Sequence, residues 1–249
     1  MKHLISLLVA LCLIFSGACK KGTTTGPDGA QTLEFSGIVT TDGGPFPNVD
    51  VYLSWSASKK TTTGADGRFS FTNVTGGNYI VTPSRAGYAF NPSNYPLDIQ
   101  ARNDLNFQAQ GAVFGSNVND ITADFMAKDQ NNNSVSLYSH FGKVILITLS
   151  ADWCGPCREE ATHLEGLYDR FKDKGFQAIT LLISGSPSSW SQEYGLTIPI
   201  LDDNAETIWD IYGEGYFPLN IILDRNCVIR YKRSGYNENE IVDIILKYL

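Results

Sequence analysis

Cysteine and histidine are scarce in this chain of 249 residues, which contains five cysteines and three histidines. Cys12 and Cys19 fall near the N-terminus, so the rest of the chain has only Cys154, Cys157 and Cys227. A disulfide-stapled scaffold would need more cysteines at paired spacings, and a structural zinc site needs four ligands. One Cys-x-x-Cys pair with isolated histidines supplies neither, so the sequence predicts no metal site and points to redox chemistry.

Positive charge is also limited. Lys and Arg together number 19 against 26 Asp and Glu, which gives a formal net charge of −7. Binding to nucleic acid, or electrostatic binding to an anionic membrane, needs clustered basic residues. We therefore expect no nucleic-acid partner and no electrostatic membrane contact.

Long hydrophobic runs are missing except at the N-terminus. There, Lys2 precedes the apolar stretch Leu4–Phe15, which is too short to span a bilayer but has the length of a signal-peptide core. The pattern predicts an export signal over residues 1–18. Residues 19–32 are rich in Gly, Thr and Lys without an apolar period, and they are predicted to form a flexible tether.

The small residues Ser16, Gly17 and Ala18 lead directly to Cys19. This stretch resembles a bacterial lipoprotein signal, which implies cleavage before Cys19, lipid attachment to its sulfur, and anchoring in the cell envelope facing the periplasm or the exterior. An ordinary signal peptide cut near Ala18 is the alternative, because such lipoprotein signals usually carry Leu where Ser16 stands.

Residues 33–110 show the pattern of an all-β domain. Phe35–Val39 alternates as a half-buried strand does, and Asp66-Gly67 between segments 61–64 and 68–71 predicts a hairpin. Several short strands with turn signals between them predict a small sandwich.

The run FSGIVTTDGGPFPNVDVYL, continued by TTTGADGRFSFTNVTGGNYIVTPSRAGY, resembles the carboxypeptidase regulatory-like, or prealbumin-like, domain. The resemblance implies a fold but no activity. Because no cluster of catalytic residue types lies in it, a spacer or docking module is favoured, with a ligand face lined by its Tyr and Trp residues as the alternative.

Residues 112–249 alternate between strand and helix patterns. Val144–Leu149 is a continuous apolar run typical of a strand buried on both faces, and Arg158–Lys174 has apolar residues at helical spacing and ends at Gly175. Asn237 is placed to cap a final amphipathic helix. This order predicts an α/β domain with a mixed sheet and helices on both faces.

The motif Cys154-Gly155-Pro156-Cys157 follows the buried strand and opens a helix. A Cys-x-x-Cys in that context predicts a redox pair, because the free N–H groups of the helix N-terminus stabilise a thiolate. Pro156 suits the first helical turn, where its missing N–H is not needed. Cys154 is predicted to attack a partner disulfide and Cys157 to resolve the mixed disulfide.

The segments ITADFMAKDQNNNSVSLYSHFGK, KVILITLSAD, WCGPCREE and FPLNIILDRN occur in this order. Together they resemble the TlpA/ResA-like branch of membrane-tethered thioredoxins, which implies a thioredoxin-like fold. By this resemblance Pro218 would be a cis-proline facing the motif, Phe217 would offer its backbone to a substrate strand, and Trp153 would shield Cys154. A trans proline at the start of a strand is the alternative for Pro218.

Three positions depart from the family pattern. Thr148 stands where thioredoxin has a buried Asp, so the proton of Cys157 must pass to water or to another group. Leu219 replaces the usual Thr after the proline and makes that edge more apolar. Cys227 occupies a turn position that is usually Gly, and it is either a bystander or a third redox partner.

These observations predict an enzyme, a thiol–disulfide oxidoreductase that reduces protein disulfides. The resemblance implies substrates such as apocytochrome c or oxidised thiol enzymes. The enzyme's only redox group would be the Cys154–Cys157 disulfide, with no added cofactor, and the resemblance implies a membrane electron donor. A disulfide donor or isomerase is one alternative. A surface-binding lipoprotein that uses the thioredoxin-like domain as a scaffold is another.

Overall fold

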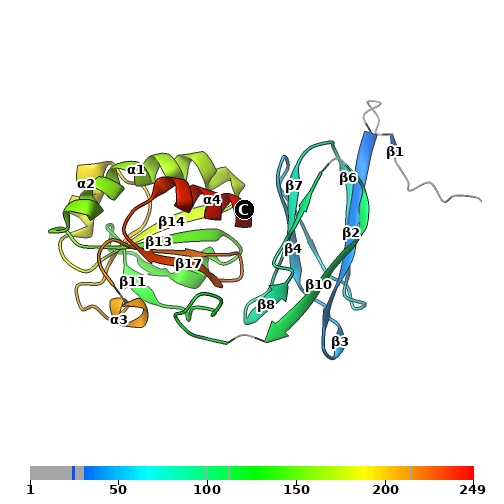
Figure 1. The fold of residues 1–249 in the computed structure, drawn as a ribbon, viewed down its shortest axis with the longest axis horizontal. Coiled ribbons are helices and arrows are strands. Elements are labelled where there is room, and N and C mark those ends of the chain that lie inside the picture. The colour runs from blue at the N-terminus through cyan, green and yellow to red at the C-terminus, as the bar shows by residue number, and fades with distance from the viewer. Residues whose placement is uncertain (1–23, 26–30, 99, 112, 214) are drawn as a thin grey trace, which may run out of the picture.

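The computed structural model describes residues 24–25, 31–98, 100–111, 113–213 and 215–249. The predicted signal over residues 1–18 and the predicted lipidation site Cys19 lie outside the described residues. Two domains are visible in Figure 1, a strand-rich N-terminal domain and a C-terminal domain in which helices cover a sheet. Within the described part of the chain, no helix is long and apolar enough to cross a membrane.

The N-terminal domain is a β-sandwich, as the sequence predicts. Its strands are β1 (Thr24–Thr25), β2 (Gln31–Thr41), β3 (Gly44–Pro45), β4 (Asp50–Trp55), β5 (Lys59–Thr62), β6 (Arg68–Val74), β7 (Tyr79–Ser84), β8 (Tyr88–Asn91), β9 (Tyr95–Leu97) and β10 (Arg102–Gly111). One sheet has the order β1-β2-β10-β8, with β3 and β6 also paired to β2, and the other has the order β5-β4-β7-β9. Alternating apolar residues such as Phe35, Val51 and Phe107 fill the space between the two sheets.

Asp66 and Gly67 form a turn, but the hairpin predicted there is wrong. Strand β5 pairs with β4 and strand β6 pairs with β2, so the turn carries the chain from one sheet to the other. Gly67 adopts φ +71°, which favours glycine, and its carbonyl accepts a hydrogen bond from the Val39 N–H of β2 at 2.8 Å. The Asp-Gly signal therefore locates the turn correctly but not the partners of the flanking strands.

The C-terminal domain has a five-stranded mixed sheet with the order β15-β14-β13-β16-β17. Its elements are β11 (Met126–Lys128), β12 (Ser134–Ser136), the 3-10 helix η1 (Leu137–His140), β13 (Val144–Ser150), α1 (Gly155–Phe171), the 3-10 helix η2 (Lys172–Lys174), β14 (Phe176–Leu182), α2 (Pro187–Tyr194), β15 (Ile200–Asp202), α3 (Trp209–Tyr212), β16 (Leu219–Leu223), β17 (Ile229–Ser234) and α4 (Glu238–Tyr248). Strands β13, β14 and β15 are parallel, whereas β16 and β17 are antiparallel to their neighbours.

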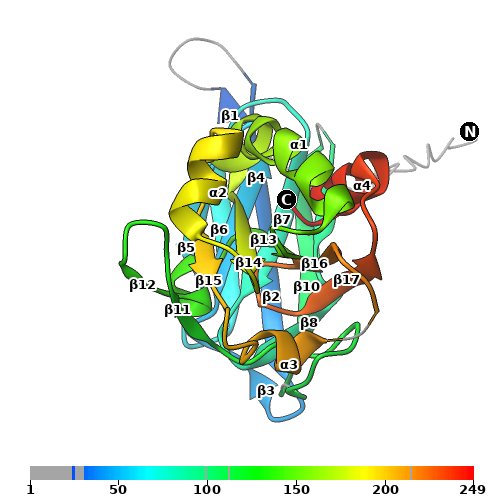
Figure 2. The ribbon, with the colours of Figure 1, turned by 90° about the vertical axis from the view of Figure 1, so that its left-hand side faces the viewer.

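Both faces of this sheet are covered, which explains the continuous apolar run of β13. Val144 and Leu146 pack against α1, α2 and α4, whereas Ile145 and Ile147 pack on the other face against α3 and η1. Figure 2 views the molecule from this end, with the C-terminal domain in front and the sandwich strands behind it. The predicted α/β domain with helices on both faces is confirmed.

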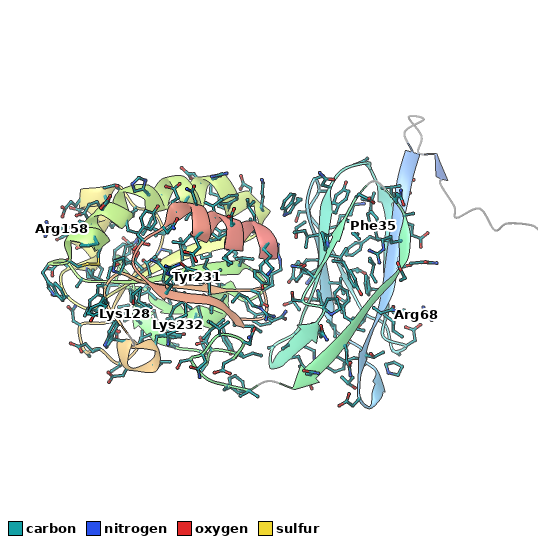
Figure 3. The ribbon with its side chains drawn as sticks, viewed as in Figure 1. Phe35, Arg68, Lys128, Arg158, Tyr231 and Lys232 are labelled. Carbon is teal, nitrogen blue, oxygen red and sulfur yellow. A yellow bond between two sulfur atoms is a disulfide. The ribbon has the colours of Figure 1, made fainter. Side chains whose placement is uncertain are left out.

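The sandwich contacts the turn between β16 and β17. Asn226 Nδ2 donates to the Pro83 carbonyl at 3.0 Å, its Oδ1 accepts from the Arg85 N–H at 3.0 Å, and Ser84 Oγ donates to the Arg225 carbonyl at 3.1 Å. Because β16 runs antiparallel to β13, this turn lies at the end of the sheet where β13 begins. The redox motif follows the other end of β13. Figure 3 shows Arg158, the residue after Cys157, at the end of the molecule farthest from the sandwich residue Arg68.

The Arg225 guanidinium is buried at this contact. It donates to the carbonyls of Gly142 at 2.7 Å, Leu249 at 2.6 Å and Lys174 at 3.2 Å in its own domain, and to Ser54 Oγ of the sandwich at 2.9 Å. Burial lowers its pKa to about 10, so it stays charged near neutral pH. One charged side chain thus joins four backbone and side-chain oxygens from both domains.

Candidate redox site

The two cysteines of the motif are joined by a disulfide, and their Cα atoms lie 5.3 Å apart. Cys154 is the N-cap of α1, and its Sγ accepts a hydrogen bond from the Cys157 N–H at 3.2 Å. Gly155 and Pro156 follow as the first helical residues, so the proline costs the helix no hydrogen bond. After reduction, the same N–H groups and the helix dipole stabilise a thiolate on Cys154.

Access to the two sulfurs differs. Cys154 is 5% exposed and Cys157 is 1% exposed, whereas the neighbouring Trp153 is 66% exposed. A partner disulfide can therefore approach Cys154 but not Cys157 directly. This difference in burial is what a division into attacking and resolving cysteine requires.

Trp153, Trp209 and Phe217 pack on one another beside the disulfide, and together with Tyr216, the exposed residue before Phe217, we call them the aromatic surface. The Phe217 ring packs edge-on against Trp153, with centroids 5.7 Å apart, and lies tilted by 32° over Trp209, with centroids 4.4 Å apart. Tyr216 is 84% exposed. An exposed apolar patch of this kind marks an interaction site, because burying it against a partner is favourable.

The Phe217–Pro218 peptide bond is cis, as the resemblance implies. The segment is held by the Gly235 N–H, which donates to the Pro218 carbonyl at 2.7 Å, and by the Tyr216 N–H, which donates to Ser234 Oγ at 3.0 Å. In the described part of the chain, no hydrogen bond uses the backbone N–H or C=O of Phe217. These groups remain available to a substrate strand.

Glu160 is a buried carboxyl group in α1, one turn after Cys157. It is 1% exposed, and neither of its oxygens has a hydrogen-bond partner among the described residues. Burial raises its pKa to about 8, against an opposing effect of the nearby Asn220 amide, which lowers the pKa. Residues at i and i+3 of a helix are neighbours on one face, so Glu160 lies on the face of Cys157.

The sheet beneath Glu160 carries a buried polar row. The hydroxyls of Thr148 and Thr180 are 3.0 Å apart, and Asn220 is in register with Thr148 on the next strand. The Asn220 Nδ2 donates to the Gly235 carbonyl at 3.1 Å, and its Oδ1 has no partner in the part of the chain that the structure describes. The Thr148 hydroxyl therefore has the Thr180 hydroxyl as its hydrogen-bond partner. Among the buried residues of α1, Glu160 is the only acidic one.

Sequence reasoning missed Glu160, although a signal was present. The buried residues of α1 are Cys157, Glu160, Ala161, Leu164, Leu167 and Phe171, a helical spacing in which one member is acidic. A carboxyl group on the apolar stripe of a helix is costly unless it is neutral or paired, so it indicates a shifted pKa.

Residues 34–110 match the carboxypeptidase regulatory-like domain, and residues 118–232 match the AhpC/TSA family. The chain joins these two domains. Over 127 residues it is 25% identical to the thiol-disulfide oxidoreductase ResA of Bacillus thuringiensis, a match that covers 50% of this chain and 73% of that protein. It is 28% identical over 116 residues to ResA of Oceanobacillus iheyensis, covering 44% and 60% respectively.

Among solved structures, the thioredoxin domain of a thiol-disulfide oxidoreductase from Bacteroides vulgatus is similar, with 23% identity and a TM-score of 0.47. That similarity covers 52% of this chain and 98% of the other. The ResA relatives confirm the resemblance found in the sequence, and this two-domain protein is a thiol–disulfide oxidoreductase.

The third cysteine of this oxidoreductase is remote from the disulfide. Cys227 is fully buried in the β16–β17 turn, at the sandwich end of the sheet, and burial raises its pKa far above that of a free thiol. Its φ of +58° is in the region that favours glycine, which explains why this turn position usually carries Gly. These properties favour the bystander over a third redox partner.

Proposed function

We propose that this oxidoreductase reduces disulfides of polypeptides outside the cytoplasm, with Cys154 as the attacking and Cys157 as the resolving cysteine. The observation that carries the proposal is the disulfide at the N-terminus of α1, whose more accessible sulfur lies beside the aromatic surface and the unbonded Phe217 backbone. A pure scaffold would not need this combination.

The reaction begins with the reduced dithiol. The Cys154 thiolate attacks one sulfur of the partner disulfide, which forms a mixed disulfide and releases the other partner sulfur as a thiolate. The Cys157 thiol then loses its proton and attacks the Cys154 sulfur. This step restores the Cys154–Cys157 disulfide and releases the second partner thiolate, so two electrons have passed to the partner.

Glu160 is the group that takes the proton of Cys157 in this proposal. Its pKa of about 8 lies close to that of a thiol, so the proton transfer is nearly balanced in either direction. In its ionised form Glu160 can accept this proton on either oxygen, because neither oxygen is engaged by another described residue. This assignment answers the question raised by Thr148, whose hydroxyl is a poor base.

The substrate class follows from the aromatic surface. An extended polypeptide with apolar side chains beside its cysteine would bury Trp153 and Tyr216 while its backbone bonds to Phe217. Such a partner is an unfolded or flexible protein segment, such as the chain of apocytochrome c or a flexible cysteine-bearing segment of an oxidised thiol enzyme. A membrane electron donor would return the Cys154–Cys157 pair to the dithiol.

The proposed location is the cell envelope, with a lipid on Cys19 facing the periplasm or the exterior. The lipoprotein-like sequence of residues 1–19 supports this location. The acidic net charge supports it too, because an acidic protein has no electrostatic attraction to an anionic membrane. Cys19→Ala should release the protein from the membrane fraction. If the variant still sediments with membranes, lipidation of Cys19 is not the anchor.

A pair of cysteine variants tests the redox assignment. Cys157→Ala should accumulate covalent adducts with envelope proteins, because the mixed disulfide on Cys154 has no neighbouring thiol to displace it. The adducts should be visible on non-reducing gels and disappear with reductant. Cys154→Ala is the matched control, and it should trap almost nothing because Cys157 is 1% exposed.

Equal trapping by both variants would show that the attacking and resolving roles are wrongly assigned. No trapping by either variant, under conditions where the wild type reduces insulin, would overturn the disulfide-exchange proposal. Adducts with c-type cytochrome precursors would support a role in cytochrome maturation, whereas adducts with many secreted proteins would favour a general reductase or an isomerase.

A further inference from the structure

A second recess lies far from the disulfide, between the outer face of the β5-β4-β7-β9 sheet and the end of α4. Its volume is about 740 Å³, within the range of small-molecule sites. Strands β4, β7 and β9 line one side through Trp55, Ile80 and Pro96, and α4 lines the other through Leu246 and Lys247. The redox mechanism uses none of these residues. We call this recess the interdomain cleft.

Trp55 is the most unusual residue of the interdomain cleft. It ends β4 with φ +84°, a backbone region that bulky side chains rarely adopt, and its side chain is 41% exposed at the mouth of the cleft. Strain of this kind persists where a side chain must be held in a particular direction, and it clusters at ligand sites. Asn or Gly would occupy this backbone position at lower cost, so the indole has another role than folding.

Two exposed amide side chains line the same cleft as this indole. In the described part of the chain, no hydrogen bond uses the side-chain amides of Asn78 and Gln100 or the Trp55 indole N–H, and all three residues line the cleft. Each amide offers a donor and an acceptor. The Arg102 guanidinium is paired with Asp104 at 2.9 Å, and the other two charged residues that line the cleft, Asp98 and Lys247, have opposite signs, so these charges balance and favour an uncharged ligand.

A peptide strand is a poor fit to the interdomain cleft. The edge strand β9 spans only Tyr95–Leu97, and its central residue, Pro96, has no N–H to donate. Strand addition needs a row of free backbone groups. The ligand must therefore be recognised by side chains.

We infer that the interdomain cleft binds an uncharged saccharide, with one sugar ring packed on Trp55 and its hydroxyls bonded to the amides of Asn78 and Gln100. A sugar ring has an apolar C–H face, which packs on an aromatic ring, and an edge of hydroxyls that both donate and accept. Amide side chains match such an edge without net charge. This binding site is independent of the proposed redox function.

The test is isothermal titration of the exported protein with tri-N-acetylchitotriose, maltotriose and cellotriose at millimolar concentration. At least one should bind to the wild type, and Trp55→Asn should weaken that binding by about tenfold or more, equivalent to about 1.4 kcal/mol. Asn tolerates positive φ, so Trp55→Asn should unfold no more easily than the wild type. Trp153→Phe, which alters an exposed tryptophan at the other end of the molecule, should bind the same saccharide as the wild type does.

Insulin reduction by Trp55→Asn should equal that of the wild type, so a failed redox proposal and a failed saccharide proposal give different results. The inference is overturned if none of the three saccharides binds, or if Trp55→Asn, folded as shown by its unfolding transition, binds as tightly as the wild type.

Discussion

The central sheet of the C-terminal domain has a buried ionisable side chain near each end, and the two differ in how many hydrogen bonds they make. Glu160, below the disulfide, has no hydrogen-bond partner among the described residues, and its pKa is raised to about 8. Arg225, at the sandwich end, donates to four oxygens, and although burial lowers its pKa to about 10, it stays charged near neutral pH.

The difference shows how burial can serve two purposes. A buried group without partners becomes neutral near physiological pH and can exchange protons, which suits chemistry at the disulfide. A buried group with many partners stays charged and fixes the elements around it. The four predictions below test this contrast, beginning with the largest expected effect.

The stability of Glu160→Gln relative to the wild type should depend on pH. Because the pKa of Glu160 is raised from 4.5 to about 8, its stabilising contribution is complete below pH 4.5 and is lost as pH rises through 8. Between pH 5 and pH 9, the variant should gain about 4 kcal/mol of unfolding free energy relative to the wild type, at about 1.4 kcal/mol per pKa unit. Urea denaturation at the two pH values measures this change.

A constant difference between the two proteins across this pH range would mean that Glu160 titrates normally. The contrast between the two ends of the sheet would then not hold. Glu159→Gln, which changes the neighbouring exposed carboxyl group, is the matched control.

Arg225→Ala should destabilise the protein by about 3 kcal/mol, because buried carbonyl oxygens lose their donor. It should also make the segment between the domains easier to cleave by proteases. Arg233→Ala removes an exposed arginine paired with Glu240 at 2.8 Å and should cost less than about 1 kcal/mol. If Arg225→Ala is as stable as Arg233→Ala, the buried guanidinium does not hold the domains together.

Glu160→Gln should also slow the resolution of the mixed disulfide by about tenfold to a hundredfold at pH 7. The reason is that Gln cannot accept the proton of Cys157, although its shape is the same. Single-turnover reduction of a fluorescent disulfide peptide separates this step from the initial attack by Cys154, whose rate should not change. Equal resolution rates would assign the proton transfer to water.

Cys227→Ser should have the smallest effect, because this thiol is buried at the end of the sheet remote from the disulfide. Insulin reduction and the reduction potential of the Cys154–Cys157 pair should match those of the wild type. A shift in either quantity would make Cys227 a third redox residue and would link the two ends of the sheet.

Local signals in the sequence predicted much of the C-terminal domain. The Asn237 side chain accepts from the Glu240 N–H at 3.3 Å and begins α4, and Gly175 with φ +87° follows the last turn after α1. Caps and glycine stops act within one turn of the chain, so they can be read from neighbouring residues. The same holds for the Cys154–Cys157 spacing at the start of α1.

Long-range features could not be predicted in this way. The turn at Asp66–Gly67 joins two sheets because its flanking strands find partners elsewhere in the chain. The bond from Arg225 to Ser54 joins residues 171 positions apart. Glu160 lies between these cases, since its place on the apolar stripe was visible but its lack of a partner depends on packing.

The pairing of β2 with β10 has a mechanical consequence. The two strands are parallel, with Leu105 opposite Gly37 and Gln108 opposite Thr40. Strand β2 is the first long strand of the sandwich, after the short β1, and β10 is the strand by which the chain leaves it toward the oxidoreductase domain. Tension applied between the N-terminal side and that domain, as in a protein tethered at one end and engaged with a partner at the other, loads the hydrogen bonds of this ladder in shear. They must then break together rather than one after another, so the sandwich should act as a stiff connector that transmits pull without unravelling.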